Sequence, residues 1–282
     1  PYTEIINQFN YLKGNLSGYG FEAASKAILT TDLKPKSYSK QFKIFNKLFT
    51  ISGFAKGSGM IFPNMATMLA FIFTDFAIDR ETLASFTKRA ADESFNRISV
   101  DGDTSTSDTV FVGTTNKKNL LITTEEKLKA LDKFYTELQK AMVDLAKKIV
   151  MDGEGAKKFI EITVENSKSV QRAKKICFSI SNSLLVKTAI AGEDANWGRL
   201  IMAIGKTQIN VQTNKIKIYI QGFLLCENGR GVEAIDEAAL TNSLKNKNIK
   251  ILVDLAEGDN EFTSWTSDLT EEYIKINADY RS

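Results

Sequence analysis

The stretch Lys56–Gly–Ser–Gly–Met–Ile–Phe–Pro–Asn–Met–Ala–Thr–Met–Leu–Ala70 joins a glycine-rich turn to a strongly apolar segment. The glycines permit a tight turn, and Pro63 fixes the backbone shortly before the small Ala66 and the hydroxyl of Thr67. The apolar residues that follow predict a buried strand. Two interpretations fit this pattern: a tight turn that enters a core strand, and a site where the chain cleaves itself before Thr67.

The absence of histidine constrains the chemistry more than any residue that is present. None of the 282 residues is His, which excludes Ser–His–Asp and Cys–His catalysis and His-based zinc or iron sites. A hydroxyl nucleophile can instead use an α-amino group as its base, with an unperturbed pKa of about 7.7–8.0. Cleavage before Thr67 would give that residue both the hydroxyl and the amine.

Composition is that of an ordinary globular protein, since 43% of the residues are hydrophobic and 25% are charged. The net charge of +3 comes from scattered basic residues, so no nucleic-acid surface is expected. No run reaches the roughly 18 apolar residues of a transmembrane helix, so no membrane span is expected either. Cys177 and Cys226 lie outside any C-x-x-C pair, which favours free thiols and a cytoplasmic protein.

Periodicity predicts an α+β fold in which helices cover the faces of layered sheets. Helices are expected from Asp79, from Thr124 as N-cap to Ile149, over 170–190, and from Trp197 to Ile204. Residues 25–29 are a short apolar run, and residues 30–35 after it are interpreted as a strand that leaves the sheet into a turn. Further strands are expected as a pair within Phe42–Phe54 and at Thr109–Val112, Phe159–Val164, Ile216–Tyr219, Ile249–Leu255 and Tyr273–Ile276.

The segment from Lys56 to Ala70 closely resembles the cleavage region of the ornithine acetyltransferases, the glutamate N-acetyltransferases of the cyclic arginine pathway. Further blocks resemble those of the same family in the family's order: Ala27–Asp32, Val100–Asp108, Asp152–Ala156, Leu185–Ala189, Gly192–Arg199 and Ile276–Arg281. Because the blocks extend over almost the whole chain, chance similarity is negligible.

This resemblance implies a fold shared with the β-aminopeptidases, an αββα sandwich of two sheets between helix layers. It implies that 1–282 is one acetyltransferase unit. Self-cleavage between Ala66 and Thr67 would divide it into 1–66, the C-terminal part of an α chain, and 67–282, the β chain. The family's usual assembly of two α and two β chains is expected with it.

The resemblance also assigns the site residue by residue. Thr67 is the nucleophile and contacts substrate, and the other substrate-binding positions are Thr30, Lys56, Glu154, Asn277 and Ser282. Lys56 stands beside glycines that leave room for a substrate carboxylate, and Glu154 suits an ammonium of ornithine. The loop Asp101–Gly–Asp103 resembles a cation-binding loop but lacks the later Gly and Glu of an EF-hand, so no metal is expected.

The implied reaction is a ping-pong transfer of acetyl from N2-acetyl-L-ornithine to L-glutamate through an ester on Thr67. It needs no cofactor, and acetyl-CoA stays open as a second donor. In the family a Thr–Gly pair that forms the oxyanion hole precedes the region where this sequence begins, and we expect it upstream of Pro1. Two alternatives remain: a β-aminopeptidase-like hydrolase, in which water replaces glutamate, and a non-catalytic remnant.

Overall fold

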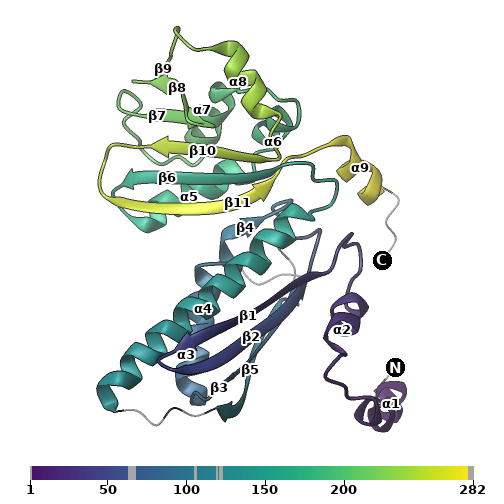
Figure 1. Cartoon of the computed structure of the whole chain (residues 1–282). Coiled ribbons are helices and arrows are strands. Elements are labelled where there is room, and N and C mark those ends of the chain that lie inside the picture. The colour runs from purple at the N-terminus through teal and green to yellow at the C-terminus, as the bar shows by residue number, and fades with distance from the viewer. Residues whose placement is uncertain (1, 63–67, 105–106, 119, 121–122, 279–282) are drawn as a thin grey trace.

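The computed structural model describes residues 2–62, 68–104, 107–118, 120 and 123–278, which form two β-sheets with helices layered on them (Figure 1). The α+β class predicted from the sequence is confirmed. Sheet order is β1-β2-β3-β5 in the four-stranded sheet and β4-β11-β6-β10-β7-β8-β9 in the seven-stranded one. Each sheet has its own hydrophobic core cluster.

The four-stranded sheet leads into the glycine-rich turn that begins at Lys56. Its strands are β1 (Lys36–Ile44), β2 (Lys47–Lys56), β3 (Leu69–Phe76) and β5 (Thr109–Lys118). β1, β2 and β3 pair antiparallel, whereas β5 runs parallel to β3. Alternate side chains of β2, such as Phe49 and Ile51, are fully buried, as expected for strands with one face on the core.

Two helices cover the inner face of this sheet: α3 (Arg80–Asp92) and α4 (Thr124–Met151). The helix predicted from Asp79 begins at Arg80, and Asp79 is its cap, accepting a hydrogen bond from the Thr82 amide. The cap of α4 is Thr123 rather than Thr124, because Thr123 forms a reciprocal capping box with Glu126. The opposite face of the sheet exposes Phe73 and Phe111, by 42% and 50%.

The seven-stranded sheet carries the remaining core. Its strands are β4 (Ile98–Ser99), β6 (Phe159–Ser167), β7 (Lys217–Ile220), β8 (Phe223–Glu227), β9 (Arg230–Gly231), β10 (Asn248–Asp254) and β11 (Asn260–Ser267). Its helices are α5 (Val170–Ser181), α6 (Leu184–Ala191), α7 (Trp197–Gly205) and α8 (Glu237–Leu244). α5 packs along β6 and β11, and the short helix η1 (Phe95–Arg97) leads into β4.

Three predicted elements were wrong. The strand predicted over 30–35 does not form, because these residues connect helix α2 (Phe21–Ala27) to β1 without helical or strand structure. The single helix predicted over 170–190 is two helices, because Ser183 caps α6 by accepting from the Val186 amide. Residues 273–276 belong to helix α9 (Glu271–Ala278), whose first turn carries two glutamates that favour a helix N-terminus. The remaining helix, α1 (Tyr2–Gly14), buries no residue.

Both cysteines are buried free thiols, as predicted. Burial raises the pKa of Cys177 to about 12, so this thiol stays protonated. Among the helices in the described part of the chain, none has the length and apolarity needed to cross a membrane.

Candidate active site

Three strand ends meet where the chain re-enters the four-stranded sheet. Lys56, the last residue of β2, lies opposite Leu69 of β3, and Leu69 lies opposite Thr109 of β5. Met68 donates its amide hydrogen to Asp108 Oδ1 over 2.5 Å, and its carbonyl accepts from the Thr109 amide. The strand register therefore places Lys56 and Asp108 on the two sides of the segment that directly follows Thr67.

The Gly57–Ser58–Gly59 turn lies against the end of α4. The Glu154 amide donates to the Ser58 carbonyl over 3.1 Å, and the Ser58 hydroxyl donates to the Asp152 carbonyl over 2.6 Å. A Cβ on Gly59 would lie 2.5 Å from the Glu154 carboxylate carbon. Only glycine therefore lets the turn approach this carboxylate so closely.

A buried network of charged side chains binds the backbone of the Gly57–Ser58–Gly59 turn. The Lys36 ammonium, 1% exposed, contacts the carboxylates of both Asp32 and Asp152. Asp32 Oδ1 also accepts the Gly57 amide over 2.7 Å. Burial alone would raise the pKa of Asp32, but the Gly57 amide and the Lys36 ammonium outweigh it and hold that pKa below its usual value.

Glu154 and Asn277 are brought together although they lie far apart in the sequence. Asn277 Nδ2 donates to Glu154 Oε2 over 2.8 Å. Helix α9 carries Asn277 and lies close to Gly155, where an added Cβ would be 2.5 Å from the Tyr273 nitrogen. The Thr270 hydroxyl fixes the start of this helix by donating to the Gly155 carbonyl over 2.7 Å.

The seven-stranded sheet supports the turn from the other side. Asp101 accepts the amides of Met60 and Ile61 over 2.6 and 2.9 Å, so its carboxylate serves the backbone rather than a cation. Within the described residues, no group of three or more His, Cys, Asp or Glu side chains could hold a metal ion. Val100 donates to the Ile61 carbonyl, and its own carbonyl accepts from the buried Lys187 ammonium over 2.8 Å.

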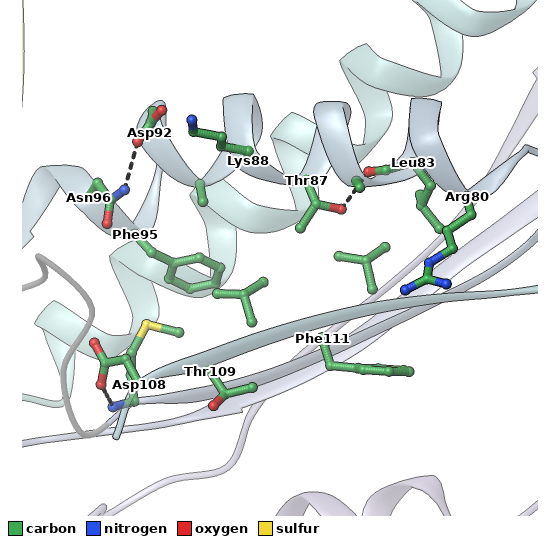
Figure 2. Close-up of a pocket in the computed structure, with 15 residues that line it drawn as sticks. Arg80, Leu83, Thr87, Lys88, Asp92, Phe95, Asn96, Asp108, Thr109 and Phe111 are labelled. Atoms are coloured by element: carbon green, nitrogen blue, oxygen red, sulfur yellow. Dashed lines mark hydrogen bonds between the residues drawn. The ribbon is translucent and has the colours of Figure 1, made fainter. Parts of the chain in front are cut away.

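A cavity of about 580 Å³ opens beside this region, between α3 and β5. Figure 2 shows Asp108 at one end of the cavity and Arg80 toward the other. The wall between them is mostly apolar and includes Leu83, Phe95 and Val110. The carboxylate beside Met68 therefore faces a space large enough for a small ligand.

The predicted site residues have different outcomes. Lys56 is 8% exposed at the end of β2, and Glu154 and Asn277 are in contact. Thr30 is an exposed residue after α2, and its amide donates to Asp32, which links it to the same turn. The cleavage pair Ala66–Thr67 and the terminal Ser282 lie outside the described residues. The site assignment as a whole stays a prediction.

Sequence reasoning missed the residues that hold the site in shape: Asp32, Lys36, Asp101, Asp108, Asp152 and Lys187. Five of these fall inside the blocks that carried the family resemblance, and a buried carboxylate or ammonium in such a block was the available signal. Their partners lie far away in sequence, with a separation of 116 residues between Lys36 and Asp152, so spacing alone could not reveal the pairs.

Known proteins with similar sequences belong to one family. A family model described as the ArgJ family matches residues 1–282. The chain is 44% identical over 280 residues to "Arginine biosynthesis bifunctional protein ArgJ" of Bartonella henselae, covering 99% of this chain and 68% of that protein. A protein of the same name from Mesorhizobium japonicum is 42% identical over 282 residues, covering 98% and 68%.

A solved structure is also similar. The crystal structure of arginine biosynthesis bifunctional protein ArgJ from Bacillus halodurans has a TM-score of 0.69 and 41% identity. The match covers 76% of this chain and all of that chain.

Proposed function

The chain belongs to the ArgJ family of arginine-biosynthesis acyltransferases, and on that premise we propose that it transfers acetyl from N2-acetyl-L-ornithine to L-glutamate through an ester on Thr67. The observation that carries the proposal is the strand register, which puts Lys56 and Asp108 beside Met68, the residue after the proposed nucleophile.

The first half-reaction makes the acetyl-enzyme. Thr67 Oγ forms a bond to the acetyl carbonyl carbon while its proton moves to the Thr67 α-amine. The bond from that carbon to the ornithine nitrogen then breaks, and the departing nitrogen takes up the proton. In the second half-reaction the glutamate amine attacks the ester carbon, and Thr67 Oγ leaves and regains a proton.

Substrate binding is proposed for the charged groups around the turn. Lys56 pairs with a substrate carboxylate, and Glu154 pairs with an ammonium of the amino acid. The hydrogen bond from Asn277 to Glu154 Oε2 orients that carboxylate. Thr30 and Ser282 are proposed as further contacts, on the family resemblance alone.

The test is the substitution Thr67→Ala. It should abolish cleavage between Ala66 and Thr67, because no Oγ is left to attack the Ala66 carbonyl, and it should abolish acetyl transfer. Intact-mass spectrometry follows the two fragments, and Thr109→Ala, on the same sheet, is the control that should still cleave. Fragments from the Thr67→Ala chain would overturn the proposed processing.

The same assays separate the alternatives. A hydrolase releases acetate from acetylornithine without glutamate, and a non-catalytic remnant stays intact and forms no acetyl-enzyme. Replacing acetylornithine by acetyl-CoA decides whether that thioester is a second donor. We further propose that 1–66 and 67–282 stay associated as two α and two β chains in the cytoplasm, where the free thiols remain reduced.

A further inference from the structure

We propose, resting on the function proposed above, that Tyr273 is a positioning residue that sets the preference for a donor with a side-chain ammonium. It does so by holding Asn277 of helix α9 in place on Glu154. The donor N2-acetyl-L-ornithine carries its α-nitrogen as an amide, so its only ammonium lies at the end of the side chain. A carboxylate selects for that end only when its own position is fixed by its neighbours.

Helix α9 has no hydrophobic anchor that would fix its position. None of the residues in Glu271–Ala278 is buried, and the side chain of Ile274 is 66% exposed. A helix of eight residues is also too short to be stable by itself in water. The position of α9 therefore depends on a few polar and close contacts.

Two of these contacts are made by Tyr273. Its backbone nitrogen lies against Gly155, where an added Cβ would be 2.5 Å away. Its hydroxyl donates to Asp101 Oδ2 over 3.4 Å, and the same oxygen accepts the Met60 amide over 2.6 Å. The side chain of Tyr273 thus connects α9 to the backbone that directly follows the Gly57–Ser58–Gly59 turn.

Tyr273 also fixes the direction of the Asn277 amide. Asn277 lies four residues later, on the same face of the helix. Its Nδ2 donates to the Tyr273 carbonyl over 3.0 Å and to Glu154 Oε2 over 2.8 Å, so both amide hydrogens have acceptors. A continuous chain of contacts therefore extends from Asp101 through Tyr273 and Asn277 to Glu154.

The Tyr273 hydroxyl is a permanent donor in this chain of contacts. Burial raises the pKa of Tyr273 to about 12, and the carboxylates of Asp101, Glu154 and Asp103 add to the rise. The phenol therefore stays protonated over the pH range in which the enzyme is assayed.

Loss of this hydroxyl should weaken recognition of the ammonium and leave the transfer of the acetyl group unchanged. Helix α9 would keep its contact at Gly155 but lose the one to Asp101, so Asn277 would no longer hold Glu154 Oε2 in one direction. The carboxylate then pairs less well with an ammonium, whereas a donor without an ammonium makes no use of it.

The experiment compares wild type with Tyr273→Phe on two donors, N2-acetyl-L-ornithine and N2-acetyl-L-norvaline, which has the same carbon chain without the amine. Phe keeps the ring and removes only the hydroxyl. We expect Tyr273→Phe to raise the KM for acetylornithine about fivefold to tenfold, typical of the loss of one hydrogen bond, with kcat unchanged. Acetylnorvaline, measured as a donor or as a competitive inhibitor, should bind as it does to wild type. Hydrogen exchange over 271–278 should become faster.

Tyr135→Phe is the matched control, because the Tyr135 hydroxyl also donates to a carboxylate, that of Glu93, over 2.6 Å. Tyr135 lies about 24 Å along α4 from the end of that helix at Met151, so this variant should leave both donors unchanged. In the Glu154→Gln background, Tyr273→Phe should have no further effect on the KM for acetylornithine, because Tyr273 acts through the Glu154 charge.

Equal losses with both donors, or a further loss in the Glu154→Gln background, would show a general structural role and overturn the inference. A wild-type KM for Tyr273→Phe also overturns it, and these results leave the proposed function standing. A wild-type enzyme that forms no acetyl-enzyme from acetylornithine overturns the proposed function and this inference with it.

Discussion

At the scale of single residues, Glu154 is the carboxylate whose role is most directly testable. Glu154→Gln keeps the size and the contact with Asn277 but removes the charge proposed to pair with an ammonium. The loss of a charge-assisted hydrogen bond should weaken use of the ornithine donor by about 1.5–3 kcal/mol in kcat/KM, with cleavage retained. Steady-state kinetics with acetylornithine measure this, and unchanged donor kinetics would contradict the assignment.

Gly59→Ala provides a second route to the same carboxylate. The added Cβ would lie 2.5 Å from the Glu154 carboxylate carbon, and the mobile end of that side chain must move away. We therefore expect the donor KM to rise with little loss of thermal stability. Gly205→Ala, where a Cβ meets nothing within 4 Å, is the control. A wild-type KM together with a lowered Tm would show that the turn moves rather than Glu154.

At the scale of elements, hydrophobic periodicity predicted the long helices correctly and failed for the short ones. Helix α4 spans 28 residues with one apolar face, so its period was unambiguous. Helix α9 has eight residues and α2 has seven, too few to separate a helical from an alternating period. For the site, Lys56 and Glu154 could be predicted because they lie in motifs that resemble the family. The Asp32–Lys36–Asp152 network could not be predicted, because folding brings its members together from distant parts of the sequence.

The docking of α9 gives a prediction at this scale. Gly155 has φ +68°, and a Cβ there would lie 2.5 Å from the backbone nitrogen of Tyr273, which cannot move independently of its helix. Gly155→Ala should therefore displace α9 and break the contact between Asn277 and Glu154. Hydrogen exchange over 271–278 should become faster, and donor KM should rise.

Gly222→Ala separates backbone strain from this clash. Gly222 also has positive φ, +85°, but nothing lies within 4 Å of the position that its Cβ would take. It should cost stability without changing exchange in α9. Equal effects of the two substitutions on exchange would contradict a specific contact between Gly155 and α9.

At the scale of the whole molecule, the candidate site depends on both sheets. The turn at Gly57–Gly59 leaves the four-stranded sheet, yet Val100 and Asp101, directly after β4, bind the amides and the carbonyl that follow the turn. Lys187 of α6 ties this contact to β11, because its ammonium donates to Val100 O, Thr266 Oγ1 and Ser267 O. A change in the seven-stranded sheet can therefore reach the proposed substrate site.

Lys187 makes this dependence measurable through pH. Burial lowers its pKa from 10.5 to about 8, since the nearby Asp268 and Asp101 only partly offset the lost hydration. Below pH 8 both folded and unfolded chains carry the proton, and the folded chain bears the full cost of a buried charge. Between about pH 8 and 10.5 the unfolded chain binds more protons, so the contribution of Lys187 to stability rises with pH.

The substitution Lys187→Met removes this titration and leaves the oxygen acceptors of the ammonium without their donor. It should destabilise the protein at pH 7.5, and the difference in unfolding free energy from wild type should widen toward pH 10, by at most about 3 kcal/mol at 1.36 kcal/mol per pKa unit. Urea unfolding at the two pH values measures it, with the exposed Lys129→Met as control. Lys187 donates to the Val100 carbonyl, and the Val100 amide donates to the Ile61 carbonyl, just after the glycine-rich turn. Because the turn lies against Glu154, the same variant should also raise the donor KM at pH 7.5. A difference in stability that is constant with pH would mean that Lys187 keeps its ordinary pKa, and that the junction between the sheets tolerates its charge.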